Sequence, residues 1–254
     1  MAVKWLCEAA FWAFLGLAAL AAALARCQRH LPARVTGVMA LAAGLILVGG
    51  ICVQTGRPPL SGAFEALSFM ALVLASLALA SQFGKEADPL LAALTWGAAA
   101  LLLALLGLVP RLVNPDWYIY QYGWTRAFFL LRLLAMAFLF YSALVALSWP
   151  KGLQEIEVRH TLVTRSRRFL ILGTALFLVG EVCGFYWCLT WLGDYWRWSR
   201  NFLESTMIFL LASAALHLPP KLAVKPLALR VAYSLPGLLA LSAYLVHLIT
   251  ESFL

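Results

Sequence analysis

The sequence predicts an all-α, polytopic membrane protein, a bundle of about eight transmembrane helices. Hydrophobic residues make up 64% of the 254 residues and charged residues only 12%, whereas a soluble domain is about 45–50% apolar and about 25% charged. Long apolar runs separated by short polar breaks fill the whole chain. Because about 20 apolar residues span a bilayer as a helix, we expect lipid to be the solvent of this chain.

Each apolar run is long enough for one span. We expect spans at roughly 4–25, 36–54, 64–82, 89–110, 127–149, 169–190, 202–218 and 231–250. The runs lack the alternation of polar and apolar residues that marks a transmembrane β-strand. They leave no room for a sizeable soluble domain, so residues 1–254 are expected to form a single transmembrane domain.

Lysine and arginine are distributed unequally between the two sets of loops. Twelve lie in one set and six in the other, and Arg132 lies inside a span. Because basic loop residues stay inside, both termini and the loops after spans two, four and six are expected outside. The richest inner stretch is the predicted loop Lys151–Arg168. The net charge of +8 therefore reflects membrane topology and not nucleic-acid binding, and we expect a multi-pass protein of the cell inner (cytoplasmic) membrane.

The outer loops are rich in aromatic residues, at 114–124 and 191–198. An ordinary interfacial belt would place similar aromatics at both faces, but near the inner loops only Trp149 and Phe83 are found. We therefore interpret the outer aromatics as the lining of a surface for a flat, apolar ligand such as haem, with a quinone as the alternative. Arginines that could bind its carboxylates are Arg57, Arg111, Arg126, Arg197 and Arg200.

Ionisable residues inside spans are costly and usually functional. His217 lies at the inner end of span seven and His247 near the outer end of span eight. Imidazole is a common haem ligand, although a histidine at a helix end also fits a snorkelling or hydrogen-bonded side chain. Arg132 is expected to face the bundle and to pair with a carboxylate, either Glu65, Glu181 or a haem propionate; the alternative is snorkelling to the outer headgroups.

Two segments resemble those of a known family. Residues 184–198 resemble the tryptophan-rich WWD segment of the CcsA-type cytochrome c biogenesis proteins, whose pattern is G-x-x-W, five residues, then G-x-Y-W-x-W-D-P-K-E. The positions in register are Gly184, Trp187, Gly193, Tyr195, Trp196 and Trp198. The family's transmembrane histidine follows the motif aspartate by eighteen residues, and that spacing falls on His217. The segment Arg57–Leu67 is similar to the family's P-L-S-N-x-Y-E-S-L segment, with Glu65 at the glutamate.

The resemblance implies a haem-handling protein of cytochrome c maturation, which presents haem at the outer face through its tryptophan-rich loop. His217 and His247 would be the ligands of the haem iron. A second membrane protein with a large outer domain and apocytochrome c would be its partners, within a haem-transfer or cytochrome c synthetase complex. The residues expected to contact haem are Trp187, Trp191, Tyr195, Trp196, Trp198, His217, His247, Arg132 and Glu65.

The chain also departs from the family pattern. Ser199 stands at the motif aspartate, Arg200 at the proline and Phe202 at the glutamate. The family's outward histidine ahead of the segment falls near Arg132 or Leu133, where this chain has no histidine. The alternative function is therefore a repurposed relative, acting as a structural, regulatory or quinone-site membrane subunit of a larger redox complex without haem transfer.

Overall fold

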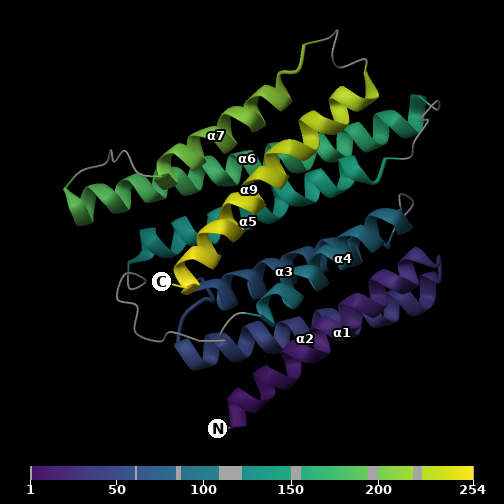
Figure 1. The fold of residues 1–254 in the computed structure, drawn as a ribbon, viewed down its shortest axis with the longest axis horizontal. Coiled ribbons are helices and arrows are strands. Elements are labelled where there is room, and N and C mark those ends of the chain that lie inside the picture. Colours follow the sequence, from purple (N-terminus) through teal and green to yellow (C-terminus); the bar gives the residue numbers. More distant parts are fainter. Residues whose placement is uncertain are drawn as a thin grey trace. The chain divides into compact units, whose positions relative to one another are not determined.

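The computed structural model describes residues 2–60, 62–83, 87–108, 122–149, 156–193, 200–219 and 225–253, without the side chains of 2, 156–160, 191–192, 200–202 and 247–253. These described residues form eight helices and no strand (Figure 1). Seven of the helices are long and apolar enough to cross a membrane, and a shorter apolar helix covers Leu203–Leu216. The prediction of a multi-pass, all-α membrane bundle is therefore confirmed.

The helices follow the predicted apolar runs. They are α1 (Ala2–Arg26), α2 (His30–Thr55), α3 (Gly62–Ala80), α4 (Pro89–Leu106), α5 (Gly123–Leu147), α6 (Ile156–Leu192), α7 (Arg200–Leu216) and α9 (Pro226–Phe253). The chain divides into two compact units, one of residues Met1–Tyr120 with Leu248–Leu254 and one of Gln121–His247. The single domain expected over 1–254 stays a prediction, and each unit is described by itself.

The first unit contains α1 to α4, and α1 and α2 form a hairpin (Figure 1). Small residues allow its helices to approach closely: a Cβ on Gly37 of α2 would lie 3.0 Å from the ring of Trp96, which is fully buried on α4. Gly56 ends α2 in the left-handed conformation, with φ of 65°. Asp88 begins α4, because its carboxylate accepts from the backbone N–H groups of Leu90 and Leu91, each at 3.0 Å.

In the second unit, α6 packs along α5 through small residues. A Cβ on Gly173 would lie 3.0 Å from the backbone nitrogen of Leu139, so only glycine permits this approach. Ser142 of α5 and Ser166 of α6 are fully buried and bond reciprocally, each hydroxyl donating to the other's backbone carbonyl at 2.8 and 3.0 Å. On α9, a Cβ on Gly237 would overlap the backbone of Leu139.

The start of α6 corrects one prediction. We expected this helix to begin near residue 169, after an inner loop over 151–168, but it begins at Ile156. Residues 156–168 contain neither proline nor glycine, so nothing in the sequence stops the helix there. The resulting helix has 37 residues, which is about 55 Å at a rise of 1.5 Å per residue.

Candidate functional site

A polar contact inside the second unit joins three helices. Arg132 of α5 pairs with Glu181 of α6, with 3.7 Å between the guanidinium nitrogen and the carboxylate oxygen. Ser205 of α7 donates its hydroxyl to the same carboxylate at 3.1 Å. The side chains of Arg132 and Glu181 are 17% and 20% exposed. The expected carboxylate partner of Arg132 is therefore Glu181 and not Glu65.

Aromatic rings surround this contact. The guanidinium carbon of Arg132 lies 5.5 Å from the centre of the Phe128 ring and 6.0 Å from that of Phe177, within the range of a cation–π contact. Phe128 stacks on Trp187 with 6.4 Å between ring centres and 25° between planes. Gly184 permits this stack, because a Cβ there would lie 2.8 Å from the Phe128 ring. We call Phe128, Arg132, Phe177, Glu181 and Trp187 the arginine–aromatic cluster.

The arginine–aromatic cluster retains hydrogen-bonding capacity. At 3.7 Å the Arg132–Glu181 contact is an ion pair but is longer than a hydrogen bond, and a guanidinium carries five N–H donors. The indole Nε1 of Trp187 is buried and has no hydrogen-bond partner among the described residues. The cluster can therefore offer N–H donors and ring faces to a flat ligand that carries a carboxylate.

Glu65 belongs to the first unit and not to the unit of Arg132, and it pairs with another arginine. It is in the first turn of α3 and binds Arg57 in a bidentate contact, with N···O distances of 2.8 and 3.1 Å. The two side chains are 0% and 6% exposed. Glu65 and Arg57 belong to one short stretch, in which Pro58 and Pro59 separate the end of α2 from the start of α3. This pairing was missed because Arg57 was interpreted as an outward-facing arginine.

His217 follows the last residue of α7 and is exposed. Its Nδ1 lies 2.9 Å from the backbone carbonyl of Ser213. Ser205 lies twelve residues earlier in the chain, which is about 18 Å along the helix axis. His217 is thus about 18 Å along α7 from the residue through which this helix contacts the arginine–aromatic cluster.

The remaining expected site residues lie outside what the structure describes. Tyr195, Trp196 and Trp198 belong to the stretch 194–199, and the side chains of Trp191 and His247 are likewise not described. Their expected contact with haem stays a prediction. Just before that stretch, the Tyr186 and Trp124 rings lie 4.6 Å apart, and both are about half exposed.

No protein-family model matches the chain, and no curated protein matches it. Among solved structures, the chain is similar to the cytochrome c haem lyase CcmF, with a TM-score of 0.68 and 17% sequence identity. The chain has the fold of the part of CcmF that it matches. The match covers 98% of this chain and 49% of CcmF, so the chain spans about half the length of that protein. The resemblance to cytochrome c biogenesis proteins is thereby confirmed at the level of the fold.

Proposed function

We propose that this chain is a haem-handling membrane protein of cytochrome c maturation, which presents haem at its outer face. The observation that carries the proposal is the CcmF fold over 98% of the chain, because it is independent of the register of the tryptophan segment. A cytochrome c haem lyase needs apocytochrome c as substrate, so apocytochrome c and a second membrane protein with a large outer domain are the expected partners. The expected location is the inner membrane, with both termini outside.

The arginine–aromatic cluster fits one part of a haem site. Arg132 supplies N–H donors for a propionate, and Trp187 and Phe128 supply ring faces for a flat macrocycle. Glu181 and Ser205 would hold the guanidinium in place while one of its edges binds the ligand. When bound, haem supplies an iron centre that takes imidazole as an axial ligand.

The contact between Nδ1 of His217 and the Ser213 carbonyl supports a role for His217 as a ligand of the haem iron. A metal-binding histidine usually donates its second ring N–H to a carbonyl or carboxylate, and this fixes the tautomer that leaves the other nitrogen free to bind metal. The Nδ1 contact with Ser213 favours that tautomer. Because His217 lies about 18 Å along α7 from Ser205, which contacts Glu181 of the cluster, we propose two haem positions, an inner one at His217 and an outer one beside Arg132.

The test is the visible absorption spectrum of the full-length protein purified in mild detergent, with haem quantified after denaturation. The wild type should show a Soret band. His217→Ala should lose the inner haem, while Trp187→Leu should weaken retention of the outer haem by up to about tenfold, because an aromatic stack contributes about 0.5–1.5 kcal/mol. Trp196→Ala and Trp198→Ala should act in the same direction.

Trp149→Leu is the matched control, because Trp149 is also buried in the second unit but follows the C-terminal end of α5, whereas Phe128 of the cluster is near its start. Equal haem loss in Trp149→Leu and Trp187→Leu would contradict a specific role for the cluster. A colourless wild type that co-purifies with a stable membrane partner would contradict the proposal altogether. That result would instead favour a structural or quinone-site subunit, which Ser199 at the motif aspartate already suggests.

A further inference from the structure

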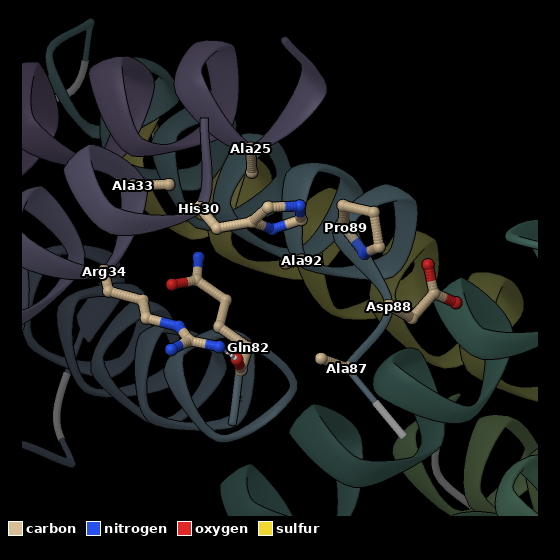
Figure 2. Close-up of a pocket in the computed structure, with 9 residues that line it drawn as sticks. All are labelled: Ala25, His30, Ala33, Arg34, Gln82, Ala87, Asp88, Pro89 and Ala92. Atoms are coloured by element: carbon tan, nitrogen blue, oxygen red, sulfur yellow. Dashed lines mark hydrogen bonds between the residues drawn. The ribbon is translucent and has the colours of Figure 1, made fainter. Parts of the chain in front are cut away.

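Basic side chains gather near helix ends in both units. In the first unit, His30, Arg34 and the buried Gln82 line a recess where the end of α1, the start of α2, the residues after α3 and the start of α4 meet (Figure 2). That recess has room for about one water molecule, so it admits no organic ligand. In the second unit, Arg167 and Arg168 of α6 are exposed, so a ligand can reach them from outside.

Three helices contribute to the surroundings of Arg167. It interacts electrostatically with Tyr233 of α9. The Tyr233 ring packs edge-on against Trp149, which follows α5, with 6.4 Å between the ring centres. Arg230 of α9 donates to the backbone carbonyl of Trp149. Because Tyr233 and Trp149 are only 5% and 3% exposed, these contacts hold the Tyr233 ring in a fixed place beside Arg167.

The hydroxyl of Tyr233 is available to a ligand. It makes no hydrogen bond to a described residue, and it is not enclosed by protein, whereas the unpartnered indole Nε1 of Trp149 is. A phenol hydroxyl donates one proton, and a guanidinium carries five N–H donors. Tyr233 and Arg167 can therefore donate together to one oxyanion, and hydrogen bonds of this kind are stronger than neutral ones.

The carboxylates described in the second unit are too distant to neutralise Arg167. They belong to Glu181 and Glu204. Glu181 lies fourteen residues beyond Arg167 on α6, which is about 21 Å along the helix axis. Glu204 is adjacent in the chain to Ser205, which contacts Glu181. Among the described side chains, the surroundings of Arg167 and Arg168 are therefore positively charged.

The position of Arg167 in α6 indicates the source of the oxyanion. The apolar part of α6 begins at Phe169, so Arg167 lies at the depth of the lipid headgroups. Every phospholipid has a phosphodiester at that depth, but phosphatidylethanolamine and phosphatidylcholine also carry a cation, which the arginines would repel. We propose that Arg167 and Tyr233 bind the phosphate of an anionic phospholipid.

The test titrates single lipids into the full-length protein purified in mild detergent and measures the bound fraction by native mass spectrometry. The wild type should bind phosphatidylglycerol about tenfold more tightly than phosphatidylcholine, the factor that one hydrogen bond between charged groups supplies. Arg167→Gln should abolish this difference. Tyr233→Phe should weaken the binding of phosphatidylglycerol by about fivefold, because it removes one donor and leaves the charge unchanged.

Tyr233→Phe is the decisive variant, because it keeps the buried ring and should therefore unfold thermally like the wild type. A Tyr233→Phe protein that binds phosphatidylglycerol as tightly as the wild type would overturn the proposal. Soluble glycerol phosphate that binds as tightly as phosphatidylglycerol would overturn the lipid as the source of the phosphate.

Arg168→Gln is the matched control, because Arg168 is also exposed but has no described interaction with Tyr233. It should weaken binding less than Arg167→Gln does. Equal effects of the two arginine changes would indicate diffuse surface charge and overturn a specific site. The haem content of each variant separates this site from a haem site: haem loss in Arg167→Gln with unchanged lipid binding would assign the arginine to a propionate and overturn the proposal.

Discussion

Arg132→Leu is the substitution that most directly tests the arginine–aromatic cluster. If Arg132 only snorkelled toward headgroups, leucine would be harmless or stabilising, because an arginine at a helix centre costs about 2.5–3.5 kcal/mol on insertion scales. The structure instead pairs Arg132 with Glu181 at 3.7 Å. The substitution would therefore leave a carboxylate inside the second unit with Ser205 as its remaining partner among the described residues.

The magnitude follows from the exposure and length of the contact. Removing one member of a fully buried ion pair costs about 3–5 kcal/mol. Here the side chains are 17% and 20% exposed, and polar contacts between membrane helices average about 0.6 kcal/mol with a maximum of about 1.7. We therefore expect Arg132→Leu to lower the free energy of unfolding by about 1–2 kcal/mol.

The assay is a double-mutant cycle of Arg132→Leu and Glu181→Leu, measured by reversible unfolding in bicelles. The double variant should be less destabilised than the sum of the single variants, by a coupling energy of about 1 kcal/mol. Arg126→Leu is the control, because Arg126 is exposed on the same helix. Strictly additive effects, or an Arg132→Leu protein as stable and as haem-rich as the wild type, would refute the pairing.

Three further outcomes follow from topology and packing. A cysteine at His160 should resist an impermeant maleimide added outside intact cells, whereas one at Asp194 should react. Gly237→Ala should lower the melting temperature, because its Cβ would overlap the α5 backbone. Ser142→Ala should destabilise by about 1 kcal/mol, and adding Ser166→Ala should cost about as much again, because each hydroxyl donates to a backbone carbonyl that the other substitution leaves in place.

Each of these predictions has a control. The labelling needs a background without the five native cysteines, and the reverse labelling pattern would overturn the orientation. Gly16→Ala should not lower stability, because a Cβ there meets nothing within 4 Å and alanine favours a helix over glycine. A Gly237→Ala protein as stable as Gly16→Ala would contradict the close approach of α9 to α5. A doubly substituted protein as stable as Ser142→Ala alone would contradict the two separate serine bonds.

The number and type of the helices could be predicted because lipid imposes one simple rule on the chain. Any long apolar run must form a helix to satisfy its backbone, and hydropathy alone finds such runs. The ends of helices that lie outside the hydrocarbon are set instead by local sequence features, such as proline, glycine and capping residues. For this reason α4 begins at its proline, as expected, while α6 begins thirteen residues earlier than expected, within a basic stretch that hydropathy treats as a loop.

The pairing of side chains was less accessible from the sequence. The sequence marks Arg132 as needing a partner, and both Glu65 and Glu181 satisfy the same charge requirement. The choice between them depends on which helices are neighbours, and apolar runs carry little information about that. Gly184 was noticed only as a motif position, whereas the structure gives it a packing role beneath Phe128. Gln82 gave no signal, because its burial results from the meeting of four helix ends.

The length of α6 has a consequence for how the protein sits in its membrane. Hydrocarbon is about 30 Å thick and membrane helices tilt by at most about 40°, whereas the 37 residues of α6 extend about 55 Å. Even at the steepest tilt, part of this helix must lie outside the hydrocarbon. Arg165, Arg167 and Arg168 therefore lie on the same uninterrupted helix as Glu181 and Trp187, which are nearer its C-terminal end. If a partner rotated α6 at its N-terminal end, Glu181 and Trp187 would turn with it, because no loop interrupts the helix between them.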